Sequence, residues 1–393
     1  MLFGSRNFRI SLLAFVLINL ALYIFIYIFG PTVEFARHNY FYNSHHYLED
    51  LRAVDGSAFN FLRSLGQYDA QWYLKIAQEG YPKNPKVISI FNKQVMDGLT
   101  YAFFPLYPAL IAFGNYFAGN VELSAFILAN ALLAANFVSL YFAVSKICTE
   151  KLAIKAIFLI FLFPFAIFYR GYFTEGLQLF LIVWFSYFLI LRRFFIAAVF
   201  LGFLNITRGN VLLLNLLFLF YFLKPFGNWR KVPVAAVLAA VLVCSLPFLL
   251  WAAYVFVQTG SPFYILTARS AWTPFPIPFI WNLANVVIFP ILPLHDFHFS
   301  MIDVLTIAGV LLMLILSRKF LRRELWLVSF CLWLLPLLVT DTMSFTRYQI
   351  ISFPLFLYLA NVLKGYTYFA VLILFALGMG AVSLLFVNWY WIG

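Results

Sequence analysis

The chain has 393 residues, of which 65% are hydrophobic and 10% are charged, and its mean hydropathy is +0.94. This composition excludes a water-soluble globular protein and indicates an integral membrane protein. The formal net charge of +12 would suit a nucleic-acid partner if the cations formed a stripe. They lie between apolar runs instead, so we expect no nucleic-acid partner. The three cysteines are isolated in or beside apolar segments and have no metal-ligand spacing: Cys148, Cys244 and Cys331.

Apolar segments of roughly membrane-spanning length follow one another along the chain. The first, residues 9–29, follows Arg6 and Arg9 and is long for the core of a signal peptide, so we interpret it as a retained span. The others cover residues 121–146, 154–169, 174–191, 232–257, 301–317, 325–341, 347–362 and 367–388.

The stretch 194–223 is apolar for about 30 residues, or about 45 Å as one helix, which exceeds the hydrocarbon core of about 30 Å. It is interrupted by a polar group that includes Thr207, Arg208, Gly209 and Asn210. One long tilted helix would place Arg208 in the middle of the bilayer. Two short helices would place the interruption in a polar pocket near one face.

The positions of the cations favour two short helices. With the N-terminus inside and 194–223 counted twice, most of the 26 Lys and Arg residues fall in short inner segments, as the positive-inside rule requires. Counting the stretch once would move residues 224–231 and 318–323 outside. We therefore predict an all-α integral membrane protein, a polytopic helical bundle of about eleven spans within a range of eleven to thirteen, with the C-terminus outside.

We expect one domain over residues 1–393. Residues 31–120 would form a large first extracytoplasmic loop with interfacial and re-entrant helices, and residues 121–393 would supply the remaining spans. Two proline-bounded segments, 101–118 and 276–294, either cross the membrane or dip into it. Re-entry is favoured for 101–118, because a crossing there would invert every later loop.

The polar groups are distributed asymmetrically across the membrane. Glu150 and Glu324 are the only acidic residues in the predicted inner loops, and the polar clusters that interrupt apolar runs all lie outside. The sequence therefore predicts a catalytic pocket on the outer face. The short outer segments contain arginine and no lysine: Arg170, Arg208, Arg269 and Arg347. A planar guanidinium suits a phosphorylated lipid, although each arginine could instead snorkel to lipid headgroups.

Residues 69–81 predict a short interfacial helix. Asp69, Trp72, Tyr73 and Ile76 recur at helical spacing and share one face. We expect this aromatic face to meet the membrane. Asp69 at the leading end either caps the helix or serves as a catalytic carboxylate.

Several motifs resemble the second GPI mannosyltransferase family (PIG-V type) and its prokaryotic relatives, within the type C glycosyltransferase superfamily. The resemblance covers nearly the whole chain from about residue 65. Two of its motifs differ, because Tyr68 stands where Trp is expected and Gly209 where Ser or Thr is expected. The matching motifs lie at residues 68–73 (Tyr-Asp-Ala-Gln-Trp-Tyr), 76–77, 80–81, 102–108 (Ala-Phe-Phe-Pro-Leu-Tyr-Pro), 163–169, 174–175, 207–208, 260–263, 346–348 and 353–356.

The resemblance implies transfer of a sugar, with mannose favoured, from a polyprenyl-phosphate donor to an acceptor hydroxyl on the extracytoplasmic face, with inversion. Asp69 would be the catalytic base, and Arg208, Arg347 and Arg170 would bind the donor phosphate. Glu175 either orients the acceptor or pairs with Arg170. Substrate binding is assigned to Trp72, Tyr73, Glu175 and Tyr348. The acceptor, a lipid, a glycan or a protein, does not follow from the family, because prokaryotes make no GPI anchors.

We expect no cofactor and no metal, since His295, Asp296 and His298 in a polar stretch are more often solvent-facing than metal ligands. The expected location is a prokaryotic plasma membrane, or the endoplasmic reticulum membrane in a eukaryote, with the site facing outside and membrane lipids around the chain. The alternative function is a lipid-linked sugar transporter (flippase) or a surface-polysaccharide polymerase. A transporter is expected to show repeat symmetry, which is not found by inspection.

Overall fold

The computed structural model describes residues 5–43, 47–85, 87–90, 93–226, 233–269, 282, 301–339 and 343–392. Each of the eleven segments predicted to span contains a helix. In chain order these are α1 (Arg6–Phe29), α7 (Val121–Ile147), α8 (Glu150–Leu162), α9 (Glu175–Ile190), α10 (Phe194–Asn205), α11 (Leu213–Leu223), α12 (Val234–Thr259), α15 (Met301–Ser317), α16 (Arg323–Val339), α18 (Phe353–Val362) and α19 (Gly365–Phe386).

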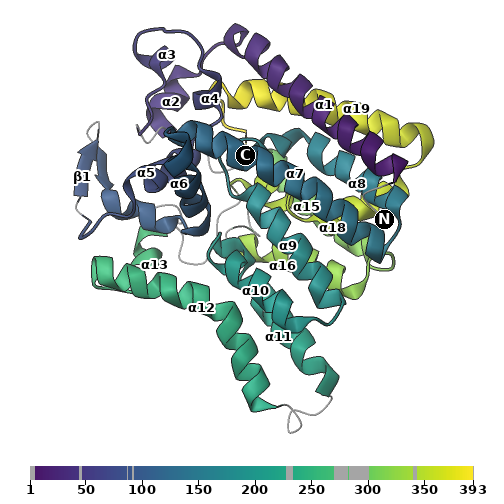
Figure 1. Ribbon diagram of the computed structural model, residues 1–393. Helices are drawn as coiled ribbons and strands as arrows, with labels where there is room; N and C mark the ends of the chain where they lie inside the picture. Colours follow the sequence, from purple (N-terminus) through teal and green to yellow (C-terminus); the bar gives the residue numbers. More distant parts are fainter. Residues whose placement is uncertain are drawn as a thin grey trace.

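Between α1 and α7 the chain forms short elements that gather on one side of the molecule (Figure 1). A small antiparallel hairpin pairs Val87 with Met96 and Ile90 with Lys93, and it is the one departure from the all-α prediction in the described residues. The elements are η2 (Gly30–Thr32), α2 (Arg37–Asn43), α3 (Leu51–Val54), α4 (Phe61–Ser64), α5 (Ala70–Glu79), β1 (Val87–Ile90), β2 (Lys93–Met96), η3 (Asp97–Ala102) and α6 (Leu106–Ala118).

Five further short elements join or extend the spans: η4 (Pro164–Tyr169), η5 (Gly209–Val211), η6 (Lys224–Phe226), α13 (Tyr264–Arg269) and α17 (Phe345–Gln349). The predicted span 154–169 ends early, at Leu162, because Pro164 cannot continue the α-helix and the chain turns into η4. The break predicted within 194–223 is confirmed, since α10 and α11 have 12 and 11 residues and are separated by η5.

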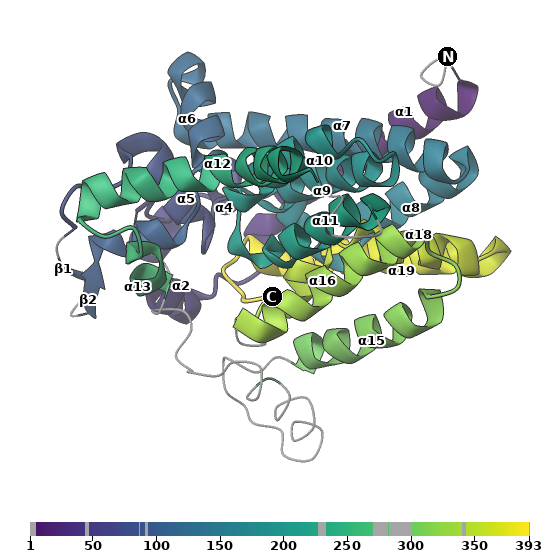
Figure 2. The same cartoon turned by 90° about the horizontal axis from the view of Figure 1, so that it is seen from below.

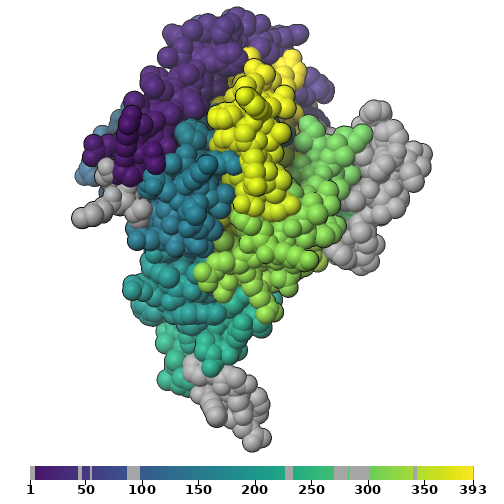
Figure 3. Space-filling view, turned by 90° about the vertical axis from the view of Figure 1, so that its right-hand side faces the viewer, coloured from purple at the N-terminus to yellow at the C-terminus, as the bar shows by residue number. Residues whose placement is uncertain are grey.

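The outer surface of the bundle is apolar, as lipid requires. Four helices, α1 with η2, α7, α12 and α19, are long and apolar enough to cross a membrane, and five apolar helices are shorter. On α19 the residues Phe369, Ile373 and Leu377 form one stripe and are 61–67% exposed. Figure 3 shows α19 in yellow on the surface of the molecule. The chain is therefore a polytopic integral membrane protein.

The helix α9 forms the centre of the bundle. Its residues are buried on nearly every face, and it packs against α7, α10 and α16. In contrast, α15 lies at the edge of the bundle, against α16 and α18 (Figure 2). Glu175 begins α9, so this residue, which the sequence singled out, is held by a helix that is packed on nearly all sides.

The helix α6 covers most of the predicted re-entrant segment 101–118. Its 13 residues correspond to about 20 Å, which is too short for a crossing. Phe113, Tyr116 and Phe117 near its end are 69%, 85% and 73% exposed, an arrangement suited to dipping into a leaflet. The second such segment, 276–294, lies outside the described residues except for Asn282.

Candidate active site

Asp69 stands at the N-cap position of α5, but its side chain makes no capping hydrogen bond. Its Oδ2 instead accepts a hydrogen bond from Nη1 of Arg347 at 2.9 Å. The preceding residue, Tyr68, has a left-handed backbone with φ of 53°, which is strained for a bulky side chain. The geometry therefore presents the Asp69 carboxylate to an arginine, and helix capping does not account for it.

The segment before α5 is fixed by residues from the other end of the chain. The ring of Tyr68 packs on Trp389 and Trp391, with ring centroids 4.8 and 4.9 Å apart. Gln67 donates from Nε2 to the carbonyl oxygen of Val387 at 2.9 Å. These contacts hold the strained Tyr68 backbone and with it the position of Asp69.

The predicted contact of the α5 aromatic face with the membrane is wrong. Trp72 and Tyr73 are 4% and 3% exposed, and they pack inside the protein against Phe103, with centroids 5.7 and 5.2 Å away. Tyr73 also meets Tyr107 edge to face. Helical spacing identified the buried face of α5 but not its neighbour, which is the segment around 103–107. Burial raises the pKa of Tyr73 to about 12, so its phenol stays protonated near neutral pH.

Arg347 lies on the short helix α17, which is anchored from two sides. The backbone N–H of Thr346 donates to Oδ1 of the buried Asp303 at 2.8 Å. The hydroxyl of Tyr169 donates to the carbonyl oxygen of Ile350 at 2.7 Å. The Arg347 side chain is 1% exposed, so its orientation is determined by packing.

Glu175 joins the two arginines that the sequence singled out. Its Oε1 accepts from Nε of Arg347 at 2.5 Å and from Nη1 of Arg208 at 2.7 Å. The Glu175 side chain is 2% exposed, whereas that of Asp69 is 24% exposed. Asp69, Arg347, Glu175 and Arg208 therefore form a continuous chain of charges, which we call the acid–arginine cluster.

Arg208 is held at the break between α10 and α11. Asn205 and Asn215 exchange two amide hydrogen bonds across this break, at 2.9 and 2.8 Å. The Arg208 guanidinium lies over the ring of Tyr348, 4.7 Å from its centroid, and its side chain is 17% exposed. The break predicted from the sequence thus places Arg208 in the acid–arginine cluster. There it lies beside Tyr348, which the sequence analysis assigned to substrate binding.

Arg269, at the end of α13, is a residue of this region that the sequence-based assignment omitted. A Cβ atom added to Gly209 would lie 2.9 Å from Nη1 of Arg269, so this guanidinium occupies the space that Ser or Thr would fill. Among the described residues Arg269 pairs with no carboxylate. Burial, followed by the neighbouring Arg208, lowers its pKa, while Tyr348 opposes the shift. In the sequence, Arg269 is one of four arginines in short outer segments. Nothing in the sequence made it a better candidate for phosphate binding than Arg170.

The structure does not bring Arg170 into the cluster. Its side chain is fully buried and donates from Nε to Asn19 at 2.9 Å, and from Nη1 and Nη2 to the carbonyl oxygens of Ala166 and Phe161. The expected alternative pairing of Glu175 with Arg170 is also replaced by its pairing with Arg208 and Arg347. Arg170 therefore links η4 to α1 and α8, and its contacts stabilise the fold.

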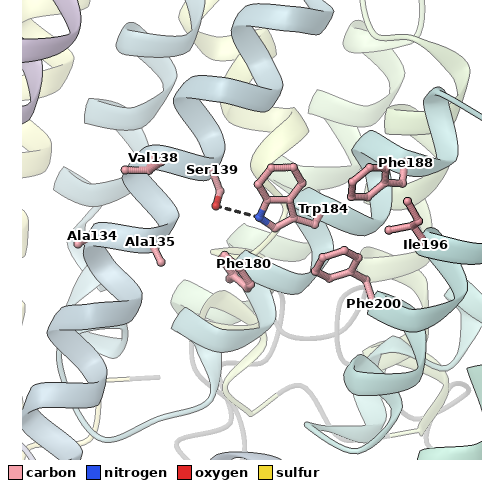
Figure 4. Close-up of a pocket in the computed structure, with 9 residues that line it drawn as sticks. All are labelled: Ala134, Ala135, Val138, Ser139, Phe180, Trp184, Phe188, Ile196 and Phe200. Carbon is pink, nitrogen blue, oxygen red and sulfur yellow. Dashed lines mark hydrogen bonds between the residues drawn. The ribbon is translucent and has the colours of Figure 1, made fainter. Parts of the chain in front are cut away.

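No group of three or more His, Cys, Asp or Glu side chains that could hold a metal occurs in the described part of the chain. The residues considered for a metal, His295, Asp296 and His298, lie outside the described residues. A groove of about 700 Å³ lies between α7, α9 and α10 (Figure 4). The polar side-chain atoms among its lining residues bind each other, since Nε1 of Trp184 donates to Oγ of Ser139 at 3.0 Å. None of its lining residues belongs to the acid–arginine cluster.

Comparison with known proteins supports the fold. The chain is similar to the crystal structure of ArnT from Cupriavidus metallidurans bound to undecaprenyl phosphate, with a TM-score of 0.52 and 12% sequence identity. The alignment covers 77% of this chain and 57% of the ArnT chain, so this chain spans little more than half the length of that protein. No protein-family model matches the sequence, and no curated protein matches it.

Proposed function

We propose that this protein is a membrane glycosyltransferase that transfers a sugar from a polyprenyl-phosphate donor to an acceptor hydroxyl on the extracytoplasmic face. The observation that carries the proposal is the pairing of a partly exposed carboxylate, Asp69, with a buried arginine, Arg347. The ArnT structure to which the fold is similar holds undecaprenyl phosphate, and the sequence motifs resemble the type C glycosyltransferases. The shared fold supports the general class of reaction, and the motifs favour mannose as the sugar.

Asp69 is the proposed general base. It is the most exposed of the four charged side chains in the cluster, so it is the one that an acceptor hydroxyl reaches first. Its ion pair with Arg347 favours the ionised carboxylate, which is the form that accepts a proton. The acceptor oxygen then attacks the anomeric carbon from the side opposite the phosphate, the C–O bond to the phosphate breaks, and the configuration inverts.

The charges of the site suit a phosphodiester. Arg208, Arg347 and the neighbouring Arg269 carry three positive charges, and Glu175 and Asp69 carry two negative charges, so these five side chains have an excess of one positive charge. A polyprenyl-phosphate sugar carries one negative charge. Nη2 of Arg347 is buried without a hydrogen-bond partner in the described part of the chain, and such a donor favours an oxygen ligand. Cations aimed at the phosphate stabilise the negative charge that grows on it as the sugar departs.

Glu175 is proposed as a positioning residue. At 2% exposure and with two arginines on one oxygen, it has little room to touch an acceptor. It fixes the relative positions of Arg208 and Arg347. Trp72 and Tyr73 are proposed to form the wall behind Asp69, and Tyr348 to support Arg208. No metal is proposed, because a phosphate leaving group stabilised by arginine needs no Lewis acid.

The test is transfer by the purified protein in proteoliposomes. Polyprenyl-phosphate donors carrying labelled mannose or another hexose are supplied with extracted membrane lipids and glycans, and the label in the acceptor fraction is measured. We expect covalent transfer with release of polyprenyl phosphate and with the anomeric configuration opposite to that of the donor. Movement of intact labelled donor across the bilayer without a new glycosidic bond would instead identify a transporter and overturn the proposal.

A further inference from the structure

A second charged cluster lies at the opposite end of the helices that carry the active-site candidates. Glu175 begins α9, and Arg192 follows the other end of this helix, which places the two about 25 Å apart at 1.5 Å per residue. Likewise, α11 runs from the Arg208 break to Lys224, and α16 runs from Arg323 toward the segment that carries Arg347. The two clusters therefore face opposite sides of the membrane.

The second cluster has a large excess of positive charge. Five cations lie around Tyr221 and the one buried carboxylate beside it, that of Glu324. We call them the basic cluster: Arg192, Lys224, Arg318, Arg322 and Arg323. Nη2 of Arg192 lies 3.6 Å and Nε of Arg322 3.9 Å from the two oxygens of Glu324. The Arg192 and Arg322 side chains remain 42% and 52% exposed, so one carboxylate leaves most of the positive charge available to a ligand.

The cations converge on one aromatic residue, Tyr221. Arg192 and Lys224 lie over its ring, 5.2 and 5.7 Å from the centroid. Tyr221 is 0% exposed, and its hydroxyl has no hydrogen-bond partner among the described residues. Arg323, Arg192 and Arg318 are within electrostatic reach of this hydroxyl. The positive-inside rule explains cations in these loops, but it does not require residues from three separate segments to meet around one buried phenol.

An apolar strip leads away from the basic cluster. Leu216 and Phe220, one turn apart on α11, are 65% and 46% exposed. The guanidinium of Arg323 lies 5.9 Å from the centre of the Phe220 ring. A ligand with an anionic head and an apolar tail would thus contact cations and exposed hydrocarbon at the same time.

From this arrangement we propose that the basic cluster binds the phosphate of an anionic phospholipid, in the leaflet opposite the acid–arginine cluster. The guanidinium groups of Arg318 and Arg323 provide planar donors for the phosphate oxygens. The acyl chains lie along Leu216 and Phe220. The proposal concerns a lipid bound from the surrounding membrane and does not depend on the sugar-transfer reaction.

The test is native mass spectrometry of the full-length protein titrated with phosphatidylglycerol. Replacing two cations with Arg318→Gln and Arg323→Gln should weaken binding by about 30-fold, at about 1 kcal/mol for each cation near an anionic lipid. The matched control, Lys146→Gln with Lys151→Gln, removes two exposed cations on the same side outside the cluster and should bind as the unaltered protein does. Equal losses in both double variants would overturn the proposal.

Two further titrations test whether the bound phosphate belongs to a lipid or is a free phosphate ion. Phosphatidylcholine, which has no net charge, should bind much more weakly than phosphatidylglycerol, and equal binding would contradict a site for anionic lipid. Inorganic phosphate should not displace phosphatidylglycerol; displacement would indicate a phosphate-ion site and overturn the lipid assignment. In the unaltered protein, phosphatidylglycerol should raise the melting temperature, and this rise should shrink as salt is added.

Discussion

Arg347 reaches Asp69 across 278 residues of sequence, with Nη1 and Oδ2 2.9 Å apart. Through Nε the same guanidinium also binds Glu175. One buried arginine therefore connects the proposed base, near the start of the chain, to the carboxylate that orients Arg208.

Asp69→Asn should reduce sugar transfer by about 10²–10⁴-fold, the usual contribution of a general base. The protein should remain folded, because the Asp69 side chain caps no helix and an amide still accepts a hydrogen bond from Arg347. Turnover is measured with labelled donor and folding by thermal melting. Asp55→Asn is the control, since Asp55 is exposed and binds the backbone N–H of Ser57. Normal turnover by Asp69→Asn would remove Asp69 from the mechanism.

Glu175→Gln should lower both stability and activity. Removing one partner of a buried ion pair costs about 3–5 kcal/mol, and here two arginines lose their shared carboxylate. Thermal melting in detergent should show a clear drop. Glu122→Gln, which breaks a pair with the 28% exposed Arg63, should melt closer to the parent protein. If the two variants melt alike, Glu175 does not hold the cluster together.

Arg208→Lys should raise the donor KM about tenfold or more, because a charge-assisted hydrogen bond contributes about 1.5–3 kcal/mol and lysine lacks the planar fork. Arg170→Lys is the matched control. It should reduce stability, because Arg170 binds Asn19 and two carbonyl groups, without changing the donor KM of the protein that remains folded. An unchanged KM in Arg208→Lys would argue for a cation that only faces lipid headgroups.

Arg269→Gln should weaken donor binding without destabilising the protein. Because Arg269 has no carboxylate partner among the described residues and lies beside Arg208, its removal relieves repulsion between like charges. We expect a higher donor KM together with an equal or higher melting temperature. A lower melting temperature with unchanged KM would show that Arg269 supports the fold and not the donor.

A reporter that is active only in the cytoplasm tests the orientation of the chain. Fusions after Arg193, Lys231 or Arg323 should give signal, and fusions after Thr259 or Gly393 should not. The reason is that the predicted inner segments carry most of the cations. Signal at Gly393 would contradict the count of eleven spans.

The break at Arg208 could be predicted because the segment 207–210, with three polar residues and a glycine, interrupts an apolar run that is too long for one crossing. The one-sided distribution of acids similarly indicated that Asp69, Arg208 and Arg347 share a face. Both inferences use only chain length and polarity. These are the properties that a membrane environment constrains most strongly.

The partners of each charge could not be predicted. Glu175 has Arg170 five residues earlier, but it binds Arg208 and Arg347, which are 33 and 172 residues away. Sequence spacing cannot show this, because η4 turns the Arg170 side chain toward Asn19 of α1. Likewise, the aromatic face of α5 has the same periodicity whether lipid or protein covers it.

The attachment of Gln67 to Val387 spans 320 residues, and it has a consequence for biosynthesis. During translation the segment with Asp69 emerges long before the segment that braces it, so the strained Tyr68 backbone has no support from Trp389 and Trp391 until then. A partly made chain already in the membrane would thus hold its carboxylate out of register with Arg347. If Asp69 is the base, as proposed, an incomplete chain that ends before Trp389 should show no sugar transfer.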